Sequence, residues 1–139
     1  MTRDARAATV AGVAVIVVLI VGFRVLGGPG TQRLVRSDER TVRAVAELAQ
    51  QMQVKFRDAE LPANLDSFPE KQKQEPLTKK PFVYRPKSKT AYQLCATFLT
   101  DDRQSQPGEP EDGWRHSQGE SCFTLDVTQP IPSVPYSYY

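Results

Sequence analysis

The sequence predicts an α+β fold in which an N-terminal transmembrane helix precedes an amphipathic helix that packs on a small three-stranded antiparallel sheet. Three observations predict this fold: an apolar run before residue 27, a helical apolar pattern between residues 38 and 58, and three short strand-like runs after residue 80. At 139 residues, the chain has room for one small domain beside the apolar run.

The N-terminal helix is expected over residues 7–26 as a single-pass membrane anchor, with residues 1–6 in the cytoplasm. No charged residue lies between Ala7 and Phe23, and the flexible side chain of Arg24 allows the span to reach Leu26. A helix needs about 20 residues to cross roughly 30 Å of hydrocarbon. Two alternatives stay open. One is a cleaved signal peptide, although no clear cleavage site follows the run, and the other is a buried helix of a soluble protein.

The arginines around this segment oppose an orientation with the C-terminal domain outside the cytoplasm. Two arginines precede the apolar run and four follow it closely: Arg3 and Arg6, then Arg24, Arg33, Arg36 and Arg40. Flanking segments rich in arginine usually stay in the cytoplasm. We nevertheless expect a protein of the cytoplasmic membrane whose C-terminal domain lies outside the cytoplasm. This expectation depends on the cysteines described below.

A linker is expected over residues 27–37, because GGPG at residues 27–30 disfavours a continuous helix. Ser37 or Asp38 is the predicted N-cap of a second helix over residues 38–58. Apolar residues recur in this helix at spacings of three and four: Val42, Val45, Ala49, Met52 and Phe56. The stripe is expected to form the core, with a partner-helix or membrane-surface role as the alternative.

Strands are expected over residues 81–85, 91–99 and 121–127, and LPANLDSF at residues 61–68 is expected to close one end of the core. Alternation in AYQLCATF and CFTLDV places the apolar residues on one face of the sheet and Cys95 and Cys122 on the other. Residues 128–139 are rich in Pro and Tyr and are expected as a polyproline II tail outside the domain.

The two cysteines are expected to form a disulfide. If the second and third strands are antiparallel neighbours, Cys95 and Cys122 face each other at a Cα separation that suits a disulfide. A cysteine pair in a small polar domain behind a membrane segment indicates an oxidising compartment. Two reduced thiols are the alternative. The bridge is expected to contribute roughly 3–4 kcal/mol in the chain-entropy account.

Basic residues concentrate between residues 71 and 89 and form a candidate site for an anionic polymer or anionic lipid. The candidate residues are Lys79, Lys80, Arg85, Lys87 and Lys89. A solvated surface is the plainer interpretation. Nucleic acid is not expected, because no set of aromatic residues for base stacking is interleaved with these charges.

Acidic residues in the loop before the third strand are weak candidates for Ca²⁺ ligands: Asp101, Asp102, Glu109, Glu111 and Asp112. Their spacing matches no EF-hand, and solvation of the loop is the alternative. His116 is the only histidine, and we expect it to lie in a mobile loop. If both cysteines are paired in a disulfide, no thiolate is available for a Cys/His nucleophilic site. We expect no enzyme, cofactor or small-molecule substrate. Trp114 is expected to hold the loop against the core.

The order of these motifs resembles the extracytoplasmic domain of bacterial membrane proteins similar to type II secretion and type IV pilus pseudopilins. The resemblance runs from Asp38 to Val127 and is most specific in YQLCATF and in the H-x-x-G-x-x-CF pattern that begins at His116. It implies a helix packed on a small antiparallel sheet and partners among envelope, secretion or pilus proteins. The apolar segment departs from that family, because it lacks the prepilin peptidase site and the glutamate that follows it.

Together these features predict a membrane-anchored, extracytoplasmic structural or interaction protein of the bacterial envelope. A binding module for an anionic polymer or Ca²⁺ is the first alternative. A secreted soluble domain released by signal cleavage is the second.

Overall fold

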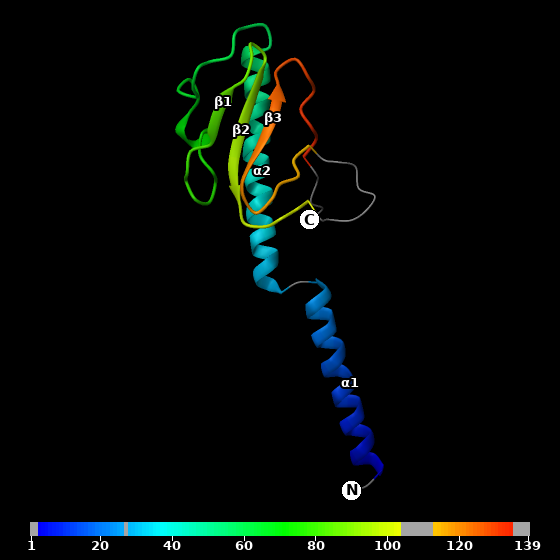
Figure 1. Cartoon of the computed structure of the whole chain (residues 1–139). Helices are drawn as coiled ribbons and strands as arrows, with labels where there is room; N and C mark the ends of the chain where they lie inside the picture. The colour runs from blue at the N-terminus through cyan, green and yellow to red at the C-terminus, as the bar shows by residue number, and fades with distance from the viewer. Residues whose placement is uncertain (1–2, 27, 104–112, 135–139) are drawn as a thin grey trace. The chain divides into compact units, whose positions relative to one another are not determined.

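The computed structural model describes residues 3–26, 28–103 and 113–134. It contains helices α1 (Arg3–Leu26) and α2 (Pro29–Phe56), a short 3-10 helix η1 (Glu70–Gln72), and strands β1 (Val83–Pro86), β2 (Ala91–Phe98) and β3 (Gly119–Asp126) (Figure 1). The chain divides into two compact units, Met1–Leu34 and Val35–Tyr139, which we describe separately. The predicted α+β class is confirmed.

The first unit is dominated by α1. Its large apolar side chains from Val10 to Val25 are 51–78% exposed. The helix is long and apolar enough to cross a membrane. The predicted apolar helix therefore exists, and it ends at Leu26 as expected.

Helix α2 begins nine residues before the predicted start, so the expected linker over residues 27–37 was wrong from Pro29 onward. The carbonyl of Gly28 accepts hydrogen bonds from the amides of Thr31 and Gln32, at N···O distances of 3.0 and 3.4 Å. Proline is favoured at the first position of a helix, because its missing N–H has no intrahelical partner there. The sequence GGPG thus separates two helices and also starts the second one.

The three strands form one antiparallel sheet in the order β1-β2-β3. In the register, Cys95 lies opposite Val83 on one side and Cys122 on the other, while Leu94 lies opposite Phe123. Helix α2 runs along one face of this sheet (Figure 1). Its Leu48 and Met52 join Leu94 and Phe123 in the hydrophobic core, and the predicted packing is confirmed.

The segment between α2 and η1 closes the core as predicted. Leu61, Leu65 and Phe68 are buried, and the Phe68 ring centroid lies 6.2 Å from that of Phe56. The hydroxyl of Tyr84 on β1 donates a hydrogen bond of 2.8 Å to the carbonyl of Pro62. These contacts hold the segment against the sheet.

The outer edge of β1 is short and interrupted by prolines. Pro86, the last residue of the strand, has no N–H, and Pro81 forms an isolated bridge with Gln74. The Phe82 amide donates to the carbonyl of Lys73 at 2.7 Å. This edge therefore offers few donors to another strand.

The chain after β3 packs on the domain at least as far as Val134, so the domain does not end at residue 127. Ile131 and Val134 pack against the core. The side-chain amide of Gln53 donates to the carbonyl of Gln129 at 2.8 Å. Sparse apolar residues between prolines carry no helical or strand period, so the sequence did not predict this contact. Residues 135–139 lie outside the described residues.

Candidate functional site

Cys95 and Cys122 form the predicted disulfide between β2 and β3, with their Cα atoms 4.0 Å apart. Cys122 is exposed, as expected from alternation, but Cys95 is only 1% exposed. Alternation predicted both cysteines on the face opposite the core, and Cys95 is covered although it does not belong to the core cluster. This residue lies in the middle strand, between Val83 and Cys122. A residue flanked by strands on both sides is covered by its neighbours even on the face away from the helix.

A carboxylate lies beside this bridge. An oxygen of Glu120 and the sulfur atoms of Cys95 and Cys122 lie within 4.8 Å of one another. Metal ions bind cysteine as the thiolate. The disulfide removes both thiolates, so the three residues do not form a metal site in the oxidised protein.

A buried and hydrogen-bonded carboxylate comes from the N-terminal half of α2. Asp38 is 3% exposed and accepts hydrogen bonds from the amides of Leu99 and Thr100, at 2.8 and 2.7 Å, and from the Thr100 hydroxyl at 2.6 Å. It was predicted as an N-cap and is instead an acceptor for the end of β2. A buried carboxylate is stable only with such partners.

His116 lies next to this carboxylate and is also buried, so the expectation of a mobile loop was wrong at this residue. Its ring stacks on Phe98 at a centroid distance of 3.9 Å. Nδ1 lies 3.3 Å from the carbonyl of Trp114, and Nε2 lies 3.7 Å from Oδ2 of Asp38. Nε2 makes no hydrogen bond with the described residues.

Trp114 anchors the same segment, as predicted. Its indole N–H donates to the carbonyl of Pro132 at 2.9 Å, and its ring meets Phe123 edge-on at a centroid distance of 5.2 Å. The Asp102 amide donates to the carbonyl of His116 at 3.0 Å. The cluster of Asp38, Thr100, Trp114 and His116 thus joins α2, the end of β2 and the segment before β3. Its chemistry is that of a structural junction, because Asp38, Thr100 and Trp114 use their hydrogen bonds to connect segments of the fold.

Local sequence patterns do not link the members of this junction, because Asp38 lies 62 residues before Thr100 and still further before Trp114 and His116. The polar neighbours of Asp38 in the chain made it look like a cap. A helical wheel of α2 would place Asp38 beside the apolar stripe that contains Val42 and Val45, which is the one available hint.

The five basic candidates are all exposed, but the structure does not gather them into one patch. Lys79 and Lys80 precede β1, whereas Lys87 and Lys89 follow it, so they lie at opposite ends of the strand. Arg85 lies between them on β1. An extended strand rises about 3.3 Å per residue, so the two lysine pairs are well separated.

Lys79 and Lys80 belong to a tight loop that a buried carboxylate holds in place. Glu75 accepts a hydrogen bond of 2.7 Å from the Thr97 amide on β2 and one from the Thr78 hydroxyl. Its own amide donates to the carbonyl of Lys80 at 2.8 Å. This loop geometry explains the position of the lysines without an anionic partner.

The structure describes two of the five predicted Ca²⁺ ligands, Asp101 and Asp102. The other three, Glu109, Glu111 and Asp112, lie outside the described residues. Asp101 forms an ion pair with Arg103 at 2.8 Å. Hydrogen bonds from Arg103 lower the pKa of the Asp101 carboxyl. A cation at Asp101 would have to displace Arg103. The backbone amide of Asp102 donates a hydrogen bond to the carbonyl of His116.

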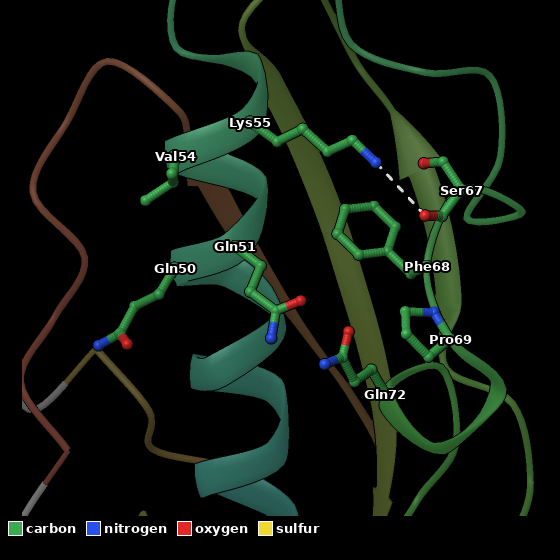
Figure 2. A pocket seen from close by; sticks show the side chains of 8 residues that line it. All are labelled: Gln50, Gln51, Val54, Lys55, Ser67, Phe68, Pro69 and Gln72. Atoms are coloured by element: carbon green, nitrogen blue, oxygen red, sulfur yellow. Dashed lines mark hydrogen bonds between the residues drawn. The ribbon is translucent and has the colours of Figure 1, made fainter.

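An open groove of about 440 Å³ lies between α2 and the segment before η1 (Figure 2). Its lining consists of Gln50, Gln51, Val54, Lys55, Ser67, Phe68, Pro69 and Gln72. Lys55 spans one end, where its Nζ donates to the carbonyl of Ser67 at 3.3 Å and lies 5.0 Å from the Phe68 ring centroid. The lining holds no acid, histidine or thiol, so this surface supports contact and not acid–base or nucleophilic chemistry.

Comparison with protein-family models, with curated proteins and with solved structures finds no match to the chain.

Proposed function

We propose that this protein is a single-pass, membrane-anchored structural or interaction protein of the bacterial envelope, with a pseudopilin-like domain outside the cytoplasm. The observation that carries the proposal is the combination, in one chain, of an exposed apolar helix and a disulfide-bonded domain. Each part supports a different half of the proposal.

The exposed apolar helix supports the anchor. Helix α1 has 24 residues, which correspond to a length of about 36 Å at 1.5 Å per residue. This length exceeds the roughly 30 Å of a hydrocarbon core. More than half of each large apolar side chain from Val10 to Val25 is exposed, and burial in lipid is the environment that removes this surface from water.

The disulfide supports the extracytoplasmic side. Disulfides persist in oxidising compartments and are rare in the cytoplasm. The arginines after α1 argue for the opposite orientation. We give the disulfide more weight, because the flanking-charge rule describes a statistical bias, whereas cytoplasmic reductants act directly on the bond between Cys95 and Cys122.

The domain supports a role by contact. A helix packed on a three-stranded antiparallel sheet is the arrangement that the resemblance to pseudopilins implies. The buried polar side chains Asp38 and Glu75 hold secondary-structure elements together. The groove beside Val54 offers apolar and amide surface to a partner.

The test is a topology measurement on the full chain, expressed in a bacterial host with a C-terminal epitope. We expect the protein to stay in the membrane pellet after alkaline carbonate extraction. We also expect added protease to remove the epitope in sphaeroplasts while a cytoplasmic marker survives. A mass measurement should show the full N-terminus and a gain of two hydrogen atoms on reduction.

Three outcomes contradict parts of the proposal separately. Release by carbonate together with loss of residues 1–26 would identify a secreted domain. An epitope that is protected until the cells are broken would reverse the topology. Two alkylated thiols in unreduced protein would remove the argument from the disulfide.

A further inference from the structure

Strand β3 forms one edge of the sheet, so every second residue directs its backbone N–H and C=O away from β2. The Val127 amide donates to the carbonyl of Thr90 at 3.0 Å, which sets the alternation: odd-numbered residues of β3 bond towards β2. The Cα atoms of Cys95 and Cys122 are 4.0 Å apart, as expected for a pair that exchanges no backbone hydrogen bonds. The even-numbered residues with outward backbone groups, which we call the open edge, are Glu120, Cys122 and Thr124.

The open edge has no hydrogen-bond partner in the described part of the chain. The segment after β3 turns away from it, because the Gln129 amide donates to the carbonyl of Asp126 at 3.1 Å and the Gln129 carbonyl accepts from Gln53 on α2. The strand sequence GESCFTLD contains neither proline nor lysine, two residues that protect the edges of sheets. The open edge can therefore accept a further strand.

The other edge of the sheet is closed. Pro86 ends β1 without an N–H, and the bridge between Pro81 and Gln74 occupies the backbone beside it. Each copy of the domain thus has one edge that can pair and one that cannot. Pairing between two open edges is symmetric and stops at two copies, whereas two open edges in each copy would allow growth without an end.

The charges on β3 select one symmetric register. Two antiparallel registers oppose outward backbone groups while all but one of the eight residues overlap. The first centres on Cys122 and places Glu120 opposite Thr124 of the second copy. The second centres on Phe123 and places Glu120 opposite Asp126 of the second copy, which opposes like charges twice. The Asp126 carbonyl also already accepts a hydrogen bond within its own chain, so the first register is the favourable one.

We propose that β3 pairs with β3 of a second copy, antiparallel and centred on Cys122, so that two three-stranded sheets become one sheet. This inference rests on the role by contact proposed above, for which it names the partner. Each opposed pair of open-edge residues exchanges two backbone hydrogen bonds. The side chains of Glu120 and Thr124 are exposed, so the pairing brings a hydroxyl beside a carboxylate and needs no buried charge.

The experiment measures self-association of the full chain by sedimentation equilibrium, in a detergent matched in density to the solvent and over a series of protein concentrations. We expect a monomer–dimer equilibrium for the wild type. Thr124→Asp puts a second carboxylate opposite Glu120, twice in the symmetric dimer, and should raise the dimer Kd about tenfold. The charge-swapped variant E120K/T124D opposes unlike charges and should bring the Kd back to the wild-type value or below it.

The matched control is Thr124→Asn, which has the shape of the aspartate variant without its charge and should change the Kd less than about twofold. Thr124→Pro removes an outward amide that its own sheet does not use, and should abolish the dimer. Every variant must form the Cys95–Cys122 bridge and keep the wild-type urea midpoint, which shows that it folds. The aspartate, asparagine and charge-swapped variants decide the question if the proline variant does not fold.

A wild type that is monomeric at every concentration would overturn the pairing, and so would equal Kd values for Thr124→Asp and Thr124→Asn. A dimer that all these variants leave unchanged has its contact outside β3 and also contradicts the pairing. Alkaline carbonate extraction of membranes with the same chain tests the anchor independently. A monomer that stays in the membrane contradicts only this inference, whereas a chain released by carbonate contradicts the proposed anchor.

Discussion

Helices α1 and α2 have similar lengths, 24 and 28 residues, but bury their apolar side chains differently. In α1 apolar residues surround the whole helix and are exposed within the folded chain. In α2 they form a stripe that packs on the sheet, and polar residues occupy the other side. The comparison shows that the periodicity of apolar residues, and not their number, determines whether a helix finds its partner inside the protein.

The largest expected effect comes from the stripe of α2. Leu48 is 1% exposed, so Leu48→Ala should lower the free energy of unfolding by about 2–5 kcal/mol. Val54 on the same helix is 86% exposed, and Val54→Ala should change that free energy by less than about 0.5 kcal/mol. Denaturant unfolding followed by the fluorescence of buried Trp114 measures both. Equal losses would mean that α2 has no buried side.

The second prediction concerns a charged residue placed in α1, which tests whether this helix spans the membrane. Ile16→Arg should make membrane insertion less favourable by about 3 kcal/mol, because arginine at the centre of a span is poorly tolerated. The fraction of protein retained after alkaline carbonate extraction should fall. Val54→Arg puts the same charge on the exposed side of α2 and should leave retention unchanged. Normal retention of Ile16→Arg would show that α1 does not span the bilayer.

The next prediction concerns Asp38, the one acidic residue among the buried residues of α2. Asp38→Asn replaces a charged acceptor of the Leu99 and Thr100 amides and should cost about 2 kcal/mol of unfolding free energy. Glu47→Gln removes a charge from the exposed side and should cost less than about 0.5 kcal/mol. Urea midpoints of the two variants give the comparison. Equal urea midpoints in the two variants would contradict a stabilising role of Asp38 in the junction.

The smallest effect is confined to alkaline pH. Burial raises the pKa of Tyr92, which faces α2 from β2. The unfolded chain releases this proton near pH 10, so the stability from the neutral phenol is complete below that pH and is lost as pH rises towards the folded pKa. The urea midpoint should therefore fall less between pH 8 and pH 11 in Tyr92→Phe than in the wild type. Equal falls would exclude Tyr92 as the cause.

Much of the fold could be predicted because it follows local patterns. The end of α1, the three strands, the core stripe of α2 and the disulfide each depend on the spacing of a few residues. The early start of α2 was missed, because Gly28 and Pro29 indicate a break, and the same Pro29 also suits the first position of a helix. The dipeptide of Gly28 and Pro29 fits both a break in the chain and the start of a helix. The spacing of apolar residues before it does not distinguish between these two structures.

The polar junction could not be predicted, because its partners meet only in the folded chain. Asp38 and His116 have no local pattern that links them to Thr100. The burial of Cys95 was missed for a related reason: alternation assigns a residue to a face, but coverage of that face depends on the neighbouring strands.

The proline-bracketed edge of β1 has a consequence for how crowded copies of the protein behave. Growth of cross-β fibres needs an open edge that can template a further strand. Pro86 removes a donor from this edge, and the bridge at Pro81 occupies the backbone beside it. High local concentration in a membrane should therefore not recruit new strands at β1, and a Pro86→Val chain should be the more amyloid-prone of the two.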